Sequence, residues 1–164
     1  MRPKVEFVAL SPRWRALPAR ALAREAIAAS IAECDLGLAA GAELCIHLAD
    51  DAHLRGLNAR WRGIDKPTNV LSFPAFEPSR LAQARLLGDI ALAYETLARE
   101  AEDEGKPLAD HYRHLVVHGF LHLVGFDHEN DADAERMEAT ETRILARLGV
   151  ADPYRAEALA ESAS

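Results

Sequence analysis

Residues 114–131, HLVVHGFLHLVGFDHEND, contain the most specific pattern in this chain. Apolar side chains fill most of the segment up to Gly125, which predicts a helix that the glycine ends in a left-handed conformation. Histidines occupy positions 118, 122 and 128. Residues four apart lie one above the other on a helix, so the first two imidazoles can converge on one ion.

This spacing is that of a three-histidine zinc site. His118 and His122 can bind from one face of the helix, and a sharp turn at Gly125 lets His128 fold back toward them. The metzincin signature has the same spacing of histidines and glycine, but Gly119 stands where that signature has a glutamate. We therefore expect His118, His122 and His128 to bind one zinc ion at the end of this helix, in the C-terminal half of the chain.

Two upstream histidines leave a second zinc site open. His111 and His114 lie on the same stripe of the helix as His118, so a site made of these three side chains is conceivable. Only the downstream set has the glycine turn and lies at a helix end, where an open metal position can reach solvent. We therefore favour the downstream set, and expect His111 and His114 to cap the helix or to hydrogen-bond around the site.

The absent glutamate favours some reactions over others. In zinc peptidases this residue takes the proton from zinc-bound water, and general-base catalysis typically contributes about 10²–10⁴-fold. Peptide hydrolysis is therefore disfavoured, whereas phosphodiester cleavage fits because its transition state spreads negative charge over phosphoryl oxygens. Such a reaction needs a cation beside the metal. Arg62 is the candidate, with Arg60 and Lys66 close in sequence, because a guanidinium grips a phosphate with two hydrogen bonds.

The composition bounds the class of protein. The chain has 164 residues and a net charge of -7, and no apolar run approaches the ~20 residues of a membrane-spanning helix. We expect one cytoplasmic domain over residues 1–155 without membrane contact, followed by a tail, 156–164, that frays. The negative charge argues against a general basic surface for nucleic acid. Basic residues nevertheless outnumber acidic ones by six to two from His53 to Leu87, so an anion would be met there.

The other cysteines and histidines show no metal-binding pattern in the sequence. Cys34 and Cys45 lie far apart without a C-x-x-C pair, so they are expected to be buried free thiols. His47 and His53 stand alone and are expected to be ordinary histidines with satisfied hydrogen bonds.

Strand and helix patterns intermingle along the chain. Short β-branched or apolar runs predict strands, and apolar residues at three- and four-residue spacing predict helices. The expected strands are 4–10, 43–49, 68–74 and 88–94; helices are expected at about 22–32, 51–62, from the fourth strand to 105, at 111–124 and at 132–148. This order predicts an α+β fold, a small α/β sandwich whose mixed sheet of about four strands is flanked by several helices.

Three blocks and a short C-terminal motif together resemble the YbeY-type endoribonucleases, which are bacterial rRNA maturation factors. WRGIDKPTNVLSFP, LLGDIAL and HGFLHLVGFDH occur in this order and are followed by DPY, so the resemblance runs from about Leu57 to Tyr154. It implies a metal-dependent, single-strand-specific endoribonuclease that matures the 3′ end of small-subunit rRNA and acts in ribosome quality control. The implied partners are single-stranded RNA of a small-subunit rRNA precursor, ribosomal small-subunit proteins and an assembly GTPase.

The resemblance also assigns residues. His118, His122 and His128 match the zinc ligands of the family, and Arg62 matches the arginine implicated in catalysis. Tyrosine is common at the positions of Trp61 and Phe126, so no phenolic hydroxyl is expected to act there.

Several alternatives stay open at this point. Asp127 either orients a ligand histidine by a hydrogen bond or caps the loop. The nucleophile is either a water molecule or the neighbouring 2′-hydroxyl of the RNA. Another zinc hydrolase would need a carboxylate such as Asp65 or Asp127 near the metal, and a non-enzymatic assembly factor stapled by zinc would need a fourth protein ligand.

Overall fold

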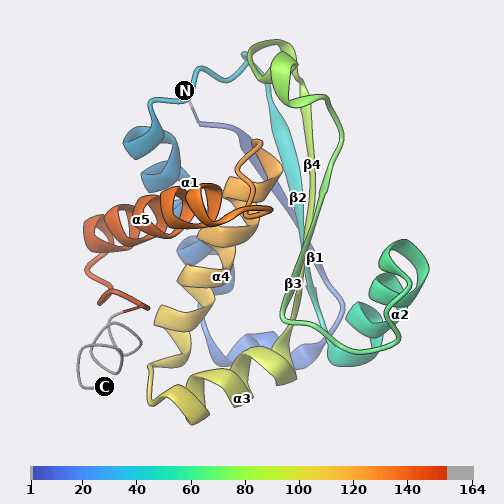
Figure 1. Ribbon diagram of the computed structural model, residues 1–164. Coiled ribbons are helices and arrows are strands. Elements are labelled where there is room, and N and C mark those ends of the chain that lie inside the picture. Colours follow the sequence, from blue (N-terminus) through green and yellow to red (C-terminus); the bar gives the residue numbers. More distant parts are fainter. Residues whose placement is uncertain (1, 155–164) are drawn as a thin grey trace.

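One mixed sheet of four strands lies at the centre of the computed structural model, which describes residues 2–154 (Figure 1). The strand order is β1-β2-β4-β3, with β1, β2 and β4 parallel and β3 antiparallel to β4. The bounds are β1 Lys4–Ala9, β2 Glu43–Ala49, β3 Val70–Pro74 and β4 Leu86–Ala93. The expected mixed sheet is confirmed, and Pro74, which has no N–H to donate to a neighbouring strand, lies at the end of the outer strand β3.

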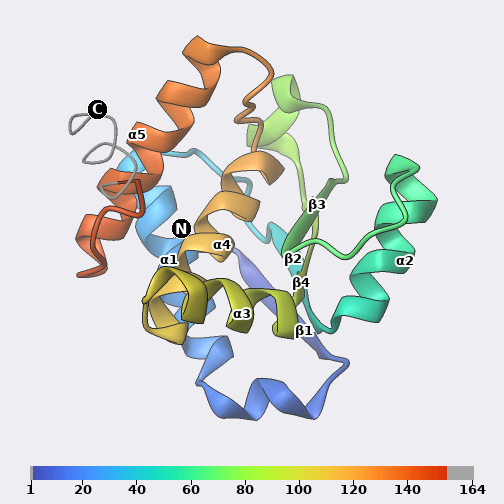
Figure 2. The same ribbon diagram turned by 60° about the horizontal axis from the view of Figure 1, so that its bottom comes forward.

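Five α-helices surround the sheet within the described residues. Figures 1 and 2 show α2 by itself on one side of the sheet, and α1, α4 and α5 on the other, with α3 near the lower end. The bounds are α1 Ala19–Cys34, α2 Asp51–Arg62, α3 Tyr94–Glu104, α4 Leu108–Leu123 and α5 Asp131–Arg147. Two 3-10 helices that the sequence did not predict, η1 Pro12–Ala16 and η2 Pro78–Gln83, fill connections between these elements.

Alternation along the strands divides the interior into two parts. On β2, Leu44, Ile46 and Leu48 face the large core that α1, α4 and α5 cover, whereas Cys45 and His47 point to the opposite face. On that opposite face, α2 and the sheet together form a smaller apolar cluster; its members are Ala49, Leu54, Leu71, Ala91 and Ala93. Helix α2 thus shields only part of this face.

Helix α4 is the central helix of the large core. Its Tyr112, Val116 and Phe120 are fully buried. A Cβ added to Gly119 would lie 3.0 Å from the Ile90 Cγ2 atom and 3.2 Å from the Val70 Cγ2 atom, so the helix passes close to the sheet at this glycine. The position where a zinc peptidase has its glutamate is therefore occupied by a helix-to-sheet contact.

Side-chain caps begin two of the helices. The Asp50 side chain accepts a hydrogen bond from the His53 backbone N–H at 2.8 Å and caps α2, and Asn130 caps α5 in the same way through Asp133. None of the helices in the described part of the chain is both long and apolar enough to cross a membrane. The predicted fraying at 156–164 lies outside the described residues.

Candidate metal centre

His118, His122 and His128 come together at the C-terminal end of α4. The first two lie on successive turns of the helix, and the third lies in the loop before α5. Their ligand nitrogens all lie within 4.8 Å of one another. The ring centroids are 4.6 Å apart for His118 and His122, 4.7 Å for His122 and His128, and 6.1 Å for His118 and His128. The arrangement can hold one metal ion with all three imidazoles.

The turn at Gly125 brings His128 back to the helix. Gly125 has a φ of 108°, a conformation that residues with a Cβ rarely adopt. The next residue, Phe126, donates its backbone N–H to the Leu121 carbonyl at 2.9 Å and so folds the loop over the last turn of α4. Because glycine adopts this conformation easily, the helix can end and the chain can turn back to place His128 beside His122.

Hydrogen bonds set the orientation of two of the three imidazoles. The Nδ1 atom of His118 donates to the Glu141 carboxylate at 2.5 Å, and the Nδ1 atom of His122 donates to the Phe126 carbonyl at 3.1 Å. Nε2 is then the nitrogen that each of these two rings has left for a metal ion. An outer hydrogen bond of this kind fixes the tautomer and the ring plane of a metal ligand.

Glu141 on α5 is the residue that the sequence interpretation missed. Its side chain is fully buried, and it also accepts hydrogen bonds from His114 at 3.1 Å and from the Tyr154 hydroxyl. Burial alone would raise the pKa of Glu141, but the hydrogen bonds from His114 and His118 outweigh this effect and lower the pKa to about 2. The carboxylate therefore stays charged behind His118.

A signal for Glu141 was present in the sequence. It lies one turn after Met137 and about one turn before Ile144 and Leu145, on the stripe of α5 that faces the core. A charged residue on an apolar stripe is rarely buried without a partner. The partner could not be identified, because it lies on another helix.

The ionisation of His122 suits a metal ligand. Burial, with the charges of His118 and His128 as smaller contributions, lowers the pKa of His122 to about 4. The imidazole is therefore neutral at pH 7, which is the form that binds metal.

The upstream histidines are held by carboxylates. His111, which is nearly fully buried, pairs with Glu100 of α3 at 3.0 Å, and His114 pairs with Glu141. The structure thus brings His118 together with His122 and His128. His111 and His114 instead form hydrogen bonds with carboxylates.

Arg62 and the three histidines line the same cleft, whose volume is about 610 Å³. Arg62 is the last residue of α2, and β3 separates that helix from α4. The Arg62 side chain is exposed and makes no hydrogen bond or ion pair with another described residue. Trp61, Ser72 and Phe73 also line this cleft. A free guanidinium and an imidazole cluster therefore open onto one space.

Two carboxylates that could have served as a base have other contacts. Asp65 forms an ion pair with Arg55 at 2.7 Å. Asp127 lines the cleft, but its Oδ1 atom accepts the backbone N–H of His128 at 2.7 Å, which is the loop-capping arrangement.

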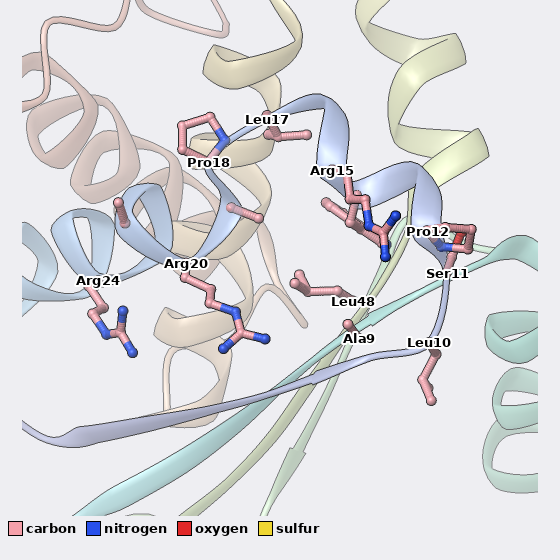
Figure 3. A pocket seen from close by; sticks show the side chains of 13 residues that line it. Ala9, Leu10, Ser11, Pro12, Arg15, Leu17, Pro18, Arg20, Arg24 and Leu48 are labelled. Carbon is pink, nitrogen blue, oxygen red and sulfur yellow. The ribbon is translucent and has the colours of Figure 1, made fainter.

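A larger hollow of about 820 Å³ lies elsewhere, between the end of β1, η1 and the start of α1 (Figure 3). Figure 3 shows Arg15, Arg20 and Arg24 at its side. The residues lining it include no histidine, cysteine or carboxylate. The groups that can bind a metal ion therefore lie outside this hollow.

Comparison with known proteins agrees with the resemblance drawn from the sequence. A family model described as endoribonuclease YbeY matches residues 15–149. Proteins named endoribonuclease YbeY from Rhodopseudomonas palustris (strain BisA53) and Nitrobacter hamburgensis (strain DSM 10229 / NCIMB 13809 / X14) are 56% and 54% identical; each match covers 93% of this chain, and 90% and 82% of those proteins. The solution structure of TM1509 from Thermotoga maritima is similar in fold, with a TM-score of 0.55 and 20% identity over 88% of this chain and 91% of that chain.

Proposed function

The chain belongs to the YbeY endoribonuclease family, and from this membership and the geometry of the cleft we propose that it is a metal-dependent, single-strand-specific endoribonuclease. His118, His122 and His128 would hold one zinc ion, and Arg62 would act on the phosphate of the substrate. The proposed catalytic domain comprises residues 1–155, and the proposed location is the cytoplasm.

The observation that carries this proposal is that Arg62 and the three histidines line one cleft although they come from opposite sides of the sheet. A phosphodiester in this cleft could contact the guanidinium and the metal together. Arg62 could donate two parallel hydrogen bonds to phosphoryl oxygens, and so offset the negative charge that develops during cleavage.

The three imidazoles fit a zinc ion of the catalytic type. Three nitrogen ligands leave one position of a tetrahedral ion open for water or substrate. A bound zinc ion supplies Lewis acidity toward a phosphate oxygen or a water molecule. The chain itself contributes the orientation of the ligands, since Glu141 holds His118 and the Phe126 carbonyl holds His122.

The proposed substrate is a small-subunit rRNA precursor, cleaved in maturation of its 3′ end and in ribosome quality control. A net charge of -7 provides no general basic surface for free RNA. We therefore propose that ribosomal small-subunit proteins and an assembly GTPase present the strand to the cleft. Cleavage products with a cyclic phosphate would identify the 2′-hydroxyl as the nucleophile, and a 3′-hydroxyl product would identify water.

The two competing functions receive less support from the site. A zinc peptidase would need a base near the metal, but Gly119 packs against the sheet and Asp65 is paired with Arg55. Asp127 lines the cleft, and one of its oxygens caps the loop by accepting the His128 backbone N–H. A zinc staple without activity would need a closed site. Among the described residues, no fourth His, Cys, Asp or Glu atom joins the three histidines within the same 4.8 Å separation.

The direct test is cleavage of an end-labelled single-stranded RNA that spans a small-subunit 3′ precursor junction. The zinc-loaded protein is compared with the variants Arg62→Ala and His118→Ala. Arg15→Ala is the matched control, because Arg15 is also an exposed arginine but lines the other hollow. The proposal expects cleavage by the wild type and the control, and its loss in the other two variants. Cleavage that survives both substitutions, or that is absent from the wild type, contradicts the proposal.

A further inference from the structure

Cys45, His47 and Asp89 form a second group of metal-ligating side chains, and it lies on the face of the sheet that α2 partly covers. Cys45 and His47 are two residues apart on β2, so they point to the same side, away from the large core. Asp89 on β4 is the register partner of Cys45. The group is therefore separated from the three-histidine cluster by the sheet itself.

The distances within this group suit a single ion. One ligand atom of each residue lies within 4.8 Å of the other two, and the His47 Nε2 atom faces the Asp89 Oδ1 atom at 3.0 Å. Ligand atoms around a tetrahedral zinc ion are roughly 3.3–3.8 Å apart, as follows from bond lengths of about 2.0–2.3 Å. The His47–Asp89 distance is close to this separation, and the adjacent, hydrogen-bonded strands β2 and β4 hold the three side chains together before any ion arrives.

We propose that Cys45, His47 and Asp89 form a second metal site that takes a borderline divalent transition-metal ion such as Zn²⁺ or Co²⁺. A sulfur and an imidazole nitrogen favour such ions, whereas Mg²⁺ and Ca²⁺ prefer sites made of oxygen ligands. A bound thiolate and a carboxylate together neutralise a divalent cation. Binding exchanges the thiol proton for the ion, and that proton is released to solvent.

The site is accessible to solvent, and carboxylates around it would favour a bound cation. The side chains of His47 and Asp89 are 28% and 48% exposed, so an ion can enter and keep a water molecule as its fourth ligand. Glu6, opposite Cys45 on β1, adds negative charge nearby and is paired with Lys4 at 2.9 Å.

A catalytic cysteine is a poorer explanation of the same three residues. Cysteine, histidine and aspartate also occur together in sites where the thiolate is a nucleophile, which requires a lowered thiol pKa. Here burial, and then the Asp89 and Glu6 carboxylates, raise the pKa of Cys45. The group therefore lacks the electrostatics of a nucleophilic cysteine.

Cobalt provides a test that separates the two sites. A cysteine thiolate bound to Co²⁺ gives a sulfur-to-metal charge-transfer band in the near ultraviolet, whereas three histidines contain no sulfur and cannot give it. The full-length protein, stripped of metal, is titrated with Co²⁺ as wild type and as the variants Cys45→Ser, Cys34→Ser and His118→Ala. We expect the band in the wild type, in Cys34→Ser and in His118→Ala, and its loss in Cys45→Ser.

Zinc content per chain, measured by atomic emission after gel filtration, is the second readout. The wild type is expected to retain about two ions, and both Cys45→Ser and His118→Ala about one. One remaining ion in Cys45→Ser also shows that this variant is folded around its other site. Asp89→Asn, which keeps the shape of the side chain, is expected to weaken Co²⁺ binding without losing the band at saturation. A wild type without the band, or a band that persists in Cys45→Ser, means that His47 and Asp89 form only an ion pair and overturns the proposal.

Discussion

The Glu141 carboxylate on α5 accepts a hydrogen bond from the Nδ1 atom of His118 on α4 at 2.5 Å. This contact links the last helix to the proposed metal site through a residue that would not touch the ion. Because Glu141 is fully buried and charged, it holds the His118 ring in one tautomer and one plane. Helix α5 is therefore expected to affect metal binding although it carries none of the three histidines.

Replacing Glu141 by Gln should weaken zinc binding about 10–100-fold, the range found when an outer partner of a metal ligand is lost. The amide keeps the shape of the side chain but not its charge. Competition with a chromophoric zinc chelator measures the affinity. The control is Glu135→Gln, an exposed position on the same helix, which should bind zinc as the wild type does. Equal affinities for all three proteins would show that Glu141 does not support the site.

The free energy of unfolding of the metal-free protein should fall in acid, because Glu141 takes up a proton when the chain unfolds at low pH. Its pKa is lowered from 4.5 to about 2 in the folded chain, so between these values the unfolded state binds more protons than the folded state. The contribution of Glu141, about 3 kcal/mol at most, is complete above the unfolded pKa and is lost as the pH falls toward 2. In urea unfolding experiments from pH 6 to pH 3, the free energy of unfolding should therefore fall more steeply for the wild type than for Glu141→Gln. Parallel curves would mean that the carboxylate has an ordinary pKa.

Short-range patterns explain what could be predicted from the sequence. The three histidines lie within one helix and its turn, so spacing alone places them together. The order of strand and helix patterns along the chain correctly predicts the mixed sheet. The contacts of Glu141 with His118, and of Cys45 with Asp89, depend on how separate elements pair. The sequence predicts His47 to be an ordinary histidine, because its neighbour in space, Asp89, lies on another strand. Cys34 and Cys45 are half-buried, whereas the sequence predicts that both are buried.

Gly119 should tolerate no glutamate, because α4 passes close to the sheet at this point. Beyond the contacts with Ile90 and Val70, an added Cβ would lie 3.3 Å from the Ser72 hydroxyl, which donates to the Gly119 carbonyl. Gly119→Glu should lower the free energy of unfolding by roughly 3 kcal/mol or more, from overpacking and a buried charge.

The matched control for this substitution is Gly56→Glu, also at a helical glycine, where an added Cβ would have nothing within 4 Å. Its free energy of unfolding should stay equal or rise by up to ~1 kcal/mol, because glutamate is the better helix former. Chemical denaturation of both variants, together with a peptide-cleavage assay, checks the prediction. A stable Gly119→Glu variant that hydrolyses peptides would show that the glycine is not required for packing and that the site is one substitution from a peptidase.

Arg62 should matter for turnover and not for the metal. It lines the cleft without a partner among the described residues, so its removal leaves the three histidines and their hydrogen bonds in place. Arg62→Ala should lower kcat for RNA cleavage about 10²–10³-fold, as for loss of one group that stabilises transition-state charge. Zinc affinity should be unchanged. Arg62→Lys keeps the charge but cannot form two parallel hydrogen bonds. Its kcat should therefore lie between those of the wild type and Arg62→Ala. Steady-state cleavage at saturating RNA, alongside zinc titration of each variant, measures both quantities. If Arg62→Ala loses zinc in proportion to activity, the arginine acts by supporting the metal site, and its proposed contact with the phosphate is wrong.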